Sequence, residues 1–129
     1  MSGERYLLDT NAVVCLLRGG GALQERLQSA NWVGISILSY IEFLAFPNLS
    51  ENDRRIFQTF CEAIDVVSLD KTEQALIDTV INLRSQHRLK LPDAIIAATA
   101  IERGATLITD DQQLRKLPAV KSAATGLTG

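Results

Sequence analysis

The sequence predicts a three-layer α/β/α fold, in which helices cover both faces of a mainly parallel central sheet of four to five strands. Two observations lead to this prediction. Short aliphatic and β-branched runs alternate with helical patterns along the chain, and the connections are long enough to reach a parallel neighbouring strand. A chain of 129 residues also suits one domain, which we expect to span residues 1–129 with its core at about 5–120.

The expected strands are short apolar runs bounded by polar or turn-forming residues. The first ends at Asp9, and the fourth ends before Asp110. The tail from Ala123 is rich in Ala, Thr and Gly, so we expect it to fray. The expected strands are residues 6–8, 32–35, 65–68 and 105–109, with residues 119–120 as a possible last strand.

Helices are predicted where apolar residues recur at helical spacing after a residue that can cap the first turn. Thr10 or Asn11 suits the start of the first helix, which is expected at 12–18. Ser36 or Ser39 suits the start of a later helix that carries residues 41–46. Ser50 opens a capping box for a helix that reaches about residue 63.

The second half of the chain shows the same kinds of signal. Asp70 and Glu73 have capping-box spacing before a helix that runs to about residue 84. Residues 85–91 then form a polar, basic connection, and Pro92 suits the first turn of the next helix. Residues 93–101 are apolar on nearly all sides, which predicts a central, buried helix. A short helix is expected at 111–116.

Composition limits the cellular context and the function. The net charge is -2, without the basic excess typical of proteins that bind duplex DNA non-specifically. Cys15 and Cys61 lie in apolar runs and are expected to be small buried hydrophobic residues of a reducing compartment. The N-terminal segment lacks a signal-peptide core, and no apolar stretch reaches the length of a membrane span. We therefore expect a cytoplasmic protein without a membrane partner.

Acidic residues stand at the edges of four apolar segments: Asp9, Glu42, Asp93 and the Asp110/Asp111 pair. Parallel sheets bind ligands outside the carboxyl ends of their strands, and two of these positions directly follow expected strands. Four carboxylates gathered there would repel one another unless a cation is bound. Oxygen ligands of this kind suit Mg²⁺ or Mn²⁺, which leaves coordination positions open for phosphate oxygens.

Each of these acids except Glu42 could instead cap the following helix or complement its dipole. Glu42 lies within a helix whose apolar neighbours cover most of the circumference, so we expect it to be buried. A buried, ionised carboxylate is unfavourable unless it is paired or bound to a metal. The alternative is that Glu42 shares a narrow solvent-facing stripe with Ser39.

Four sequence blocks together resemble a known family. LLDTN (7–11), SYIEFLAF (39–46), LPDAIIAATA (91–100) and LITDDQQL (107–114) occur in the order found in PIN-domain nucleases. The resemblance covers residues 5 to 120, and in length the chain is most similar to the VapC-type toxin ribonucleases of toxin–antitoxin pairs. The first block is common among proteins, whereas the four blocks in order are specific.

The resemblance implies a role for each acid. Asp9 and Asp93 look like the pair that binds Mg²⁺ or Mn²⁺ most directly, and Glu42 looks like the helix glutamate that completes the acidic pocket. The family's fourth acid stands second after the threonine that ends a strand, which selects Asp111, because Asp110 occupies a position that is often not acidic. The residues that resemble polar supports of the pocket are Asn11 and Thr109.

The resemblance further implies an endoribonuclease that cuts single-stranded or looped RNA by in-line attack of a metal-activated water. It also implies a homodimer and a small antitoxin whose tail covers the acidic pocket. The basic connection carries Arg84, Arg88 and Lys90 close to Asp93, where these residues could hold the RNA backbone. Its alternative interpretation is a solvated loop, and His87 is expected to be a surface residue of it.

Three other functions are compatible with parts of the pattern. A PIN-like domain could have lost activity and serve as an RNA- or protein-binding module. An aspartyl-nucleophile phosphatase commonly has a second Asp two residues after the first, but Asn11 stands there. A phospho-acceptor receiver domain needs an acidic pair near the first strand and a lysine after a late strand, and neither is evident.

Overall fold

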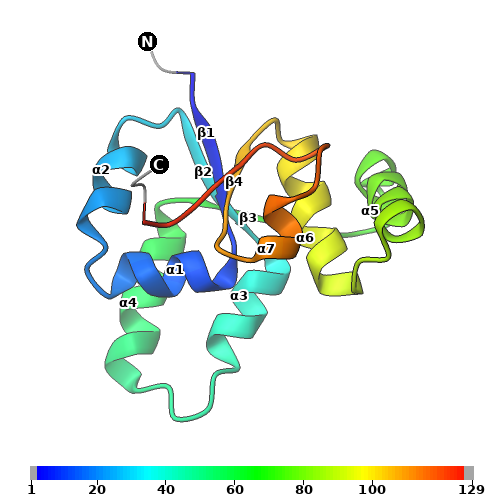
Figure 1. Ribbon diagram of the computed structural model, residues 1–129. Coiled ribbons are helices and arrows are strands. Elements are labelled where there is room, and N and C mark those ends of the chain that lie inside the picture. The colour runs from blue at the N-terminus through cyan, green and yellow to red at the C-terminus, as the bar shows by residue number, and fades with distance from the viewer. Residues whose placement is uncertain (1–2, 127–129) are drawn as a thin grey trace.

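The computed structural model describes residues 3–126 and contains one five-stranded sheet (Figure 1). The strands lie in the order β3–β2–β1–β4–β5, and every neighbouring pair is parallel. The predicted fold class is therefore confirmed. The strands are β1 (Arg5–Leu8), β2 (Trp32–Ser36), β3 (Asp65–Val67), β4 (Thr106–Ile108) and β5 (Ser122–Ala123).

Helices cover both faces of the sheet, with α1, α2 and α4 on one side and α5, α6 and α7 on the other (Figure 1). α3 begins directly after β2 and extends beyond the carboxyl edge of the sheet. The helices are α1 (Thr10–Leu17), α2 (Gly21–Gln28), α3 (Ile37–Leu44), α4 (Glu51–Glu62), α5 (Gln74–His87), α6 (Leu91–Glu102) and α7 (Gln112–Arg115).

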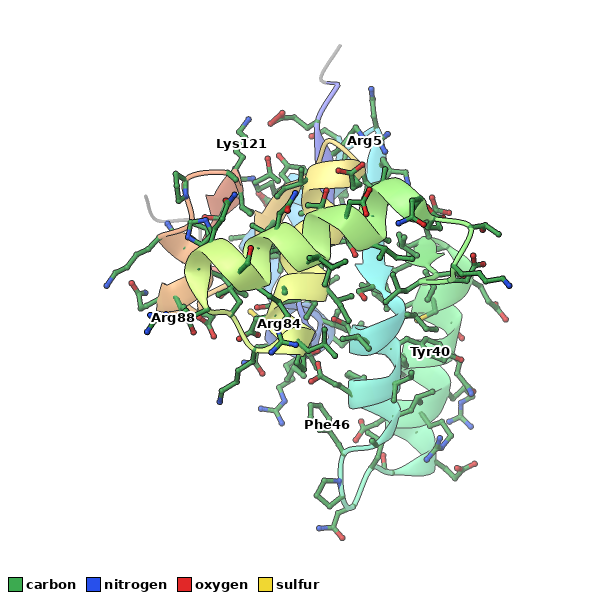
Figure 2. The ribbon with its side chains drawn as sticks, turned by 90° about the vertical axis from the view of Figure 1, so that its right-hand side faces the viewer. Arg5, Tyr40, Phe46, Arg84, Arg88 and Lys121 are labelled. Carbon is green, nitrogen blue, oxygen red and sulfur yellow. The ribbon has the colours of Figure 1, made fainter. Side chains whose placement is uncertain are left out.

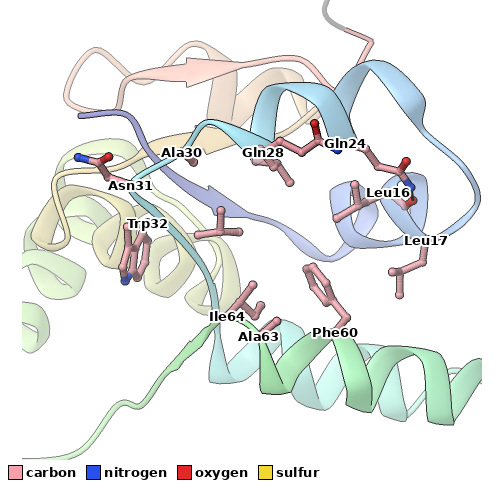
Figure 3. A pocket seen from close by; sticks show the side chains of 12 residues that line it. Leu16, Leu17, Gln24, Gln28, Ala30, Asn31, Trp32, Phe60, Ala63 and Ile64 are labelled. Carbon is pink, nitrogen blue, oxygen red and sulfur yellow. Dashed lines mark hydrogen bonds between the residues drawn. The ribbon is translucent and has the colours of Figure 1, made fainter. Parts of the chain in front are cut away.

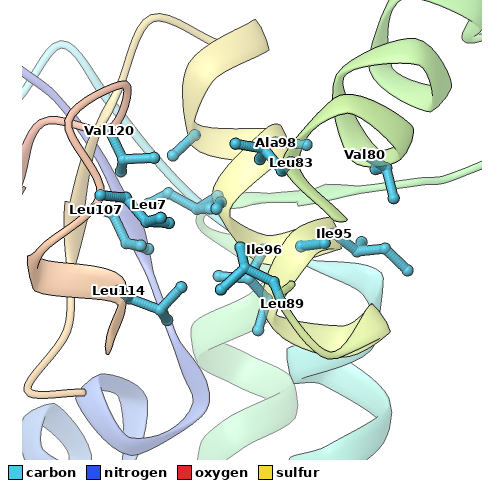
Figure 4. Packing of buried hydrophobic residues seen from close by; sticks show 14 of the residues in the cluster. Leu7, Val80, Leu83, Leu89, Ile95, Ile96, Ala98, Leu107, Leu114 and Val120 are labelled. Atoms are coloured by element: carbon cyan, nitrogen blue, oxygen red, sulfur yellow. The ribbon is translucent and has the colours of Figure 1, made fainter. Parts of the chain in front are cut away.

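The alternation of side chains along the central strands divides the core into two halves. Leu7 and Leu107 point to the face covered by α5 and α6, whereas Tyr6, Leu8 and Ile108 point to the face covered by α1 and α4. As predicted, α6 is buried on almost all sides, and each of residues 94–100 is buried (Figure 4). A helix enclosed in this way has little freedom to shift, so it holds the residues of its first turn in a fixed place.

The structure corrects both predicted ends of α5. Asp70 does not form a capping box, because its carboxylate accepts the backbone N–H of Thr72 in a turn before the helix, which begins at Gln74. Residues 85–87 are helical rather than part of the connection. The helix ends where Arg88 adopts a left-handed backbone with φ 56°, and this turn directs Leu89 into the core.

The last strand also differs from the prediction. Residues 119–120 are not a strand, because the chain turns there: Val120 N–H donates to Leu117 O and its side chain enters the core. β5 instead pairs Ser122 and Ala123 with β4. The expectation of a frayed tail is wrong for residues 123–125, while residues 127–129 lie outside the described residues.

Gly34 in β2 lies directly beneath the indole ring of Trp32. A Cβ atom at residue 34 would come within 2.4 Å of Trp32 Cη2 and 2.6 Å of Cζ2. The ring is held in place from two sides, because its Nε1–H donates to Asp65 and the Arg5 guanidinium lies 4.7 Å from its centroid. The absence of a side chain at residue 34 therefore allows the ring to lie flat over the strand.

We expect Gly34→Ala to lower the free energy of unfolding by about 1–3 kcal/mol, because the indole must leave its position over the strand. Thermal or urea denaturation would measure the loss. Gly21→Ala is the matched control: its Cβ would meet nothing within 4 Å, so it should be neutral or slightly stabilising. Equal stability of the two variants would contradict this account of the ring.

Candidate active site

The acidic residues gather at the carboxyl edge of the sheet, where β1 and β4 end side by side. Asp9 directly follows β1, and its backbone N–H donates to Ile108 O at the end of β4 at 3.2 Å. Thr109 and Asp111 follow β4 within three residues. Neighbouring parallel strands thus bring together residues about 100 positions apart in sequence, in the place where such sheets hold ligands.

Asp9 is buried, with 7% of its surface exposed. It caps α1, since Oδ1 accepts the N–H of Ala12 at 2.8 Å, and the predicted caps Thr10 and Asn11 are helical residues instead. Burial raises the pKa of Asp9, and the negative charges of Asp110 and Asp111 raise it further. Hydrogen bonds from Thr109 and Ala12 act in the opposite direction. The carboxylate is therefore fixed in position, but its charge is only partly compensated.

Thr109 connects two of the acids. Its fully buried hydroxyl donates to Asp9 and accepts the backbone N–H of Asp111 at 3.0 Å. Asp111 in turn caps α7, with Oδ1 accepting the N–H groups of Gln113 and Leu114. A side chain that donates to one carboxylate and fixes the backbone of the other sets their relative position. Thr109 therefore connects Asp9 to the segment that carries Asp111.

Asp110 and Asp111 point in different directions. Asp111 lines the acidic cleft, whereas the carboxylate of Asp110 binds the C-terminal segment. Thr125 donates to it twice, from its backbone N–H at 2.9 Å and from its hydroxyl at 2.5 Å. These bonds lower the pKa of Asp110. We call this pair of bonds the C-terminal latch. Because Ala123 O also accepts Thr109 N–H, the latch anchors the segment that carries Asp111.

Asp93 lies in the first turn of α6 and is half-buried. Burial raises its pKa, as do the charges of Asp111 and Glu42, while Lys90 opposes them. Each of these neighbours acts on Asp93 from a different element. The electrostatic effects therefore show that Asp93, Glu42 and Asp111 share one anionic field.

Glu42 is exposed, so the expectation that it is buried was wrong. α3 extends beyond the sheet (Figure 1), and in its C-terminal half only the face that carries Phe43 is buried, which leaves Ile41 and Glu42 exposed. The alternative stripe is not found either, because Ser39 is buried and Ser36 caps the helix. Glu42 nevertheless turns toward the other acids: Thr10 Oγ1 donates to its Oε1 at 2.5 Å. From the sequence, Thr10 is predicted only as a cap of the first helix, and its bond to Glu42 is not.

These side chains line a cleft of about 420 Å³. It holds carboxylates from the end of β1, from α3, from α6 and from the start of α7. Asn11 also lines the cleft and is exposed. The lining residues are Asp9, Thr10, Asn11, Glu42, Ala45, Phe46, Asp93, Ile96, Asp111 and Leu114.

The donor set of the cleft fits a hydrated divalent cation. Within residues 3–126, no three His, Cys, Asp or Glu side chains converge closely enough to bind a bare ion directly. Mg²⁺ commonly uses one or two carboxylates and keeps several waters, which can reach the more distant acids. All four acids offer only oxygen, the ligand atom that Mg²⁺ and Mn²⁺ prefer.

None of the predicted basic residues lines the cleft. Arg84 belongs to α5 and donates from Nε to Leu89 O at 3.3 Å, and Arg88 ends that helix (Figure 2). Lys90 precedes α6 and is near enough to Asp93 to lower its pKa. Of the three, Lys90 therefore has the most direct relation to the acids.

A second hollow, of about 560 Å³, lies between α1, α2, β2 and α4 (Figure 3). Leu16, Phe60 and Ile64 supply part of its apolar lining, and Gln24 and Asn31 supply polar groups. It contains none of the acids of the cleft. Its chemistry is that of an apolar groove, so it does not belong to the acidic site.

Comparison with known proteins identifies the family. The family model for the PIN domain matches residues 6–120. The chain belongs to the PIN domain family. This confirms the resemblance drawn from the four sequence blocks. No significant match to a curated protein sequence was found.

Solved structures support the same assignment of this PIN domain. A toxin–antitoxin complex from Klebsiella pneumoniae is 25% identical with a TM-score of 0.73, covering 89% of this chain and 94% of that chain. VapBC2 from Rickettsia felis, bound to a promoter DNA fragment, has a TM-score of 0.76 at 17% identity and covers 93% and 98%. DNA-bound VapBC from Salmonella typhimurium gives 0.76 at 18%, with 95% and 98% covered. The last two likenesses concern the fold alone.

The helices of this PIN domain are short compared with the thickness of a lipid bilayer. Between residues 3 and 126, none is long and apolar enough to cross a membrane. α6, the helix with the most buried residues, comprises only 12 residues and is enclosed by the protein itself.

Asp9→Asn should stabilise the metal-free PIN domain by on the order of 1 kcal/mol at neutral pH. Asn can still cap α1, while the buried charge and its repulsion by Asp111 are removed. The folded-state pKa of Asp9 lies above its ordinary 3.8, so the wild type loses stability as pH rises through that pKa. The advantage of the variant should therefore grow from pH 4 to pH 7 in melts with EDTA. A less stable variant at every pH would show that the carboxylate is mainly structural.

Thr125→Val tests the C-terminal latch, because it removes the hydroxyl donor and keeps the backbone N–H. We expect a loss of about 0.5–1 kcal/mol at neutral pH, near the lower end for such bonds because Asp110 is exposed. The pKa of Asp110 is lowered in the folded state, so this stability is present above pH 3.8 and lost as pH falls through the folded pKa. Denaturation at pH 7 and pH 3 measures both effects, and Thr125→Ser should behave like the wild type.

Proposed function

We propose that this PIN domain is a metal-dependent endoribonuclease that cuts single-stranded or looped RNA. The observation that carries the proposal is the convergence of Asp9, Glu42, Asp93 and Asp111 on one cleft from four separate segments. Burial and mutual repulsion raise the pKa values of Asp9 and Asp93, which is unfavourable for the fold by itself. Local conflicts of this kind concentrate at functional sites.

Asp9 and Asp93 are the residues that would hold Mg²⁺ or Mn²⁺, because they are the acids of the cleft whose pKa values burial and neighbouring negative charges raise. When bound, such an ion supplies a Lewis acid for the phosphate and lowers the pKa of water. The two carboxylates contribute the negative charge that attracts the ion and fix its place at the sheet edge. Glu42 and Asp111 add to the field that acts on Asp93.

Asp111 and Glu42 are the proton acceptors of the proposal. Both hydrogen bonds that fix Asp111 end on Oδ1, which leaves Oδ2 to orient a water or take its proton. Glu42 Oε1 is held by Thr10, which leaves Oε2 for the same task. Rigid positioning of such acceptors is a large part of hydrolytic catalysis.

The chain carries a net charge of -2 and so offers no broad basic surface to RNA. In this proposal RNA is therefore held mainly at the acidic cleft, where a bound cation would attract the phosphate. Lys90 is the favoured phosphate contact next to Asp93, and Arg84 and Arg88 extend the positive charge along α5. Few cationic contacts imply a weak dependence of affinity on salt. Backbone contacts of this kind position the strand without reading its sequence.

We further propose that the protein acts in the cytoplasm as the toxin of a type II toxin–antitoxin system, as a homodimer inhibited by an antitoxin that covers the acidic cleft. The support is that the similar structures from Klebsiella, Rickettsia and Salmonella are described as toxin–antitoxin or VapBC complexes. Co-expression with the protein encoded by the adjacent reading frame tests this part. A true partner would restore growth and co-purify with the domain.

The alternatives make different predictions. An inactive binding module would bind RNA without producing fragments in any divalent metal. A phosphatase would hydrolyse a small phosphomonoester and leave RNA intact. Measuring RNA binding, RNA cleavage and phosphomonoester hydrolysis with the wild-type protein therefore separates the three functions.

Asp93→Asn should reduce Mg²⁺- or Mn²⁺-dependent cleavage of single-stranded RNA by at least about 100-fold while the fold is kept. The reason is the loss of one of the two charges that would hold the ion. Asp78→Asn is the matched control, because it makes the same chemical change on an exposed face of α5. Cleavage of a labelled RNA with metal and with EDTA gives the measurement. Full activity of Asp93→Asn, or activity in EDTA, would refute the proposal.

A further inference from the structure

Phe46 places an exposed aromatic ring in the acidic cleft. It follows α3, is 38% exposed, and lines the cleft beside Glu42 and Ala45. Figure 2 shows the ring at the end of α3, on the side of that helix where α6 begins. A large apolar ring cannot bind a cation as an oxygen ligand, and this ring stands outside the buried core, between the acidic cleft and a smaller apolar hollow lined by Val14, Leu17 and Ile56.

A column of aromatic rings holds Phe46 from behind. Phe57 is fully buried and stacks on Phe43, with ring centroids 4.0 Å apart and planes inclined by 13°. Phe43 contacts Phe46 at 5.6 Å, and Tyr40 contacts Phe57 at 5.5 Å. The column thus begins in the core and ends with one ring at the cleft. Phe46 is therefore supported by rigid neighbours on one side and accessible on the other.

We propose that Phe46 is a stacking platform for a nucleobase of the substrate strand, next to the phosphate held at the acids. This inference rests on the proposed function and adds a residue that selects the form of the nucleic acid. Aromatic rings bind single strands by stacking on their bases, whichever base it is. A base can stack on a protein ring only when it is unpaired, so the platform favours single strands and loops over duplexes.

Position distinguishes Phe46 from an exposed apolar residue of the preceding helix, α3. Ile41 is more exposed, at 55%, but it does not line the cleft. Phe46 alone brings an aromatic face to the acids among the residues that line the cleft. Phe46 also borders the apolar hollow lined by Val14 and Ile56, so an apolar segment of a protein partner is the competing occupant. The position of the ring beside Glu42 in the acidic cleft favours a base joined to a phosphate at the acids.

Binding to a cleavage-deficient protein tests the platform directly. We would measure the affinity of Asp9→Asn protein for a labelled 12-nucleotide single-stranded RNA by fluorescence anisotropy. Adding Phe46→Leu keeps an apolar side chain and removes the ring, and should weaken binding by about 5- to 150-fold. Adding Phe46→Trp should keep or strengthen binding. Ile41→Ala is the matched control and should leave the affinity unchanged.

RNA with one abasic site provides a second, independent measurement. An abasic site at the stacked nucleotide should weaken binding to the protein with Phe46 and have little further effect with Phe46→Leu, because both changes remove the same contact. Duplex RNA should not distinguish the variants. Equal affinities of the Leu, Trp and parent proteins would overturn the platform, as would a change in oligomeric state without a change in RNA affinity.

The experiment separates this inference from the proposed function. If the wild-type protein neither cuts nor binds RNA, the proposed function fails whatever residue 46 is. If it cuts RNA and Phe46→Leu binds and cuts like the wild type, only the platform fails. Melting curves of each variant establish that the fold is kept before affinities are compared.

Discussion

The repulsion among carboxylates at the carboxyl edge of β1 and β4 is the constraint on which the rest of the site depends. Asp9 is buried there although the charges of Asp110 and Asp111 raise its pKa. The charges of Asp111 and Glu42 likewise raise the pKa of Asp93. Such an arrangement persists only where the surrounding structure leaves the acids no other position. The enclosed helix α6, the central position of β1 in the sheet and the buried hydroxyl of Thr109 supply that restraint.

Capping and site formation turn out to be two uses of the same side chains. Asp9 caps α1 through Oδ1 and still lines the cleft, and Asp111 caps α7 through Oδ1 and does the same. Capping fixes the rotamer of a carboxylate by tying one oxygen to the backbone, and the other oxygen then has a defined direction. The alternatives weighed for the sequence are therefore compatible, and the cap becomes a means of orienting the acid.

The sequence predicted the sheet, the enclosed helix α6 and the gathering of acids, because these follow from apolar periodicity and from strand ends. Strand ends and periodicity left open which of two adjacent acids faces the cleft, and only the family resemblance selected Asp111. That choice depends on Thr125, a residue 15 positions from Asp110 in the segment expected to fray. The exposure of Glu42 was missed for a similar reason. The apolar residues around it suggested burial, but whether α3 is covered depends on how far it extends past the sheet.

Neutral residues set the geometry of the cleft on both sides. On one side the C-terminal latch ties Asp110 to Thr125, so the next residue, Asp111, is presented to the cleft from an anchored segment. On the other side the ring column from Phe57 through Phe43 supports Phe46 beside Glu42. The carboxylates determine what the cleft attracts. The latch fixes the segment that carries Asp111, and the ring column fixes the position of Phe46. A search restricted to acidic residues therefore finds the site but omits the residues that give it its shape.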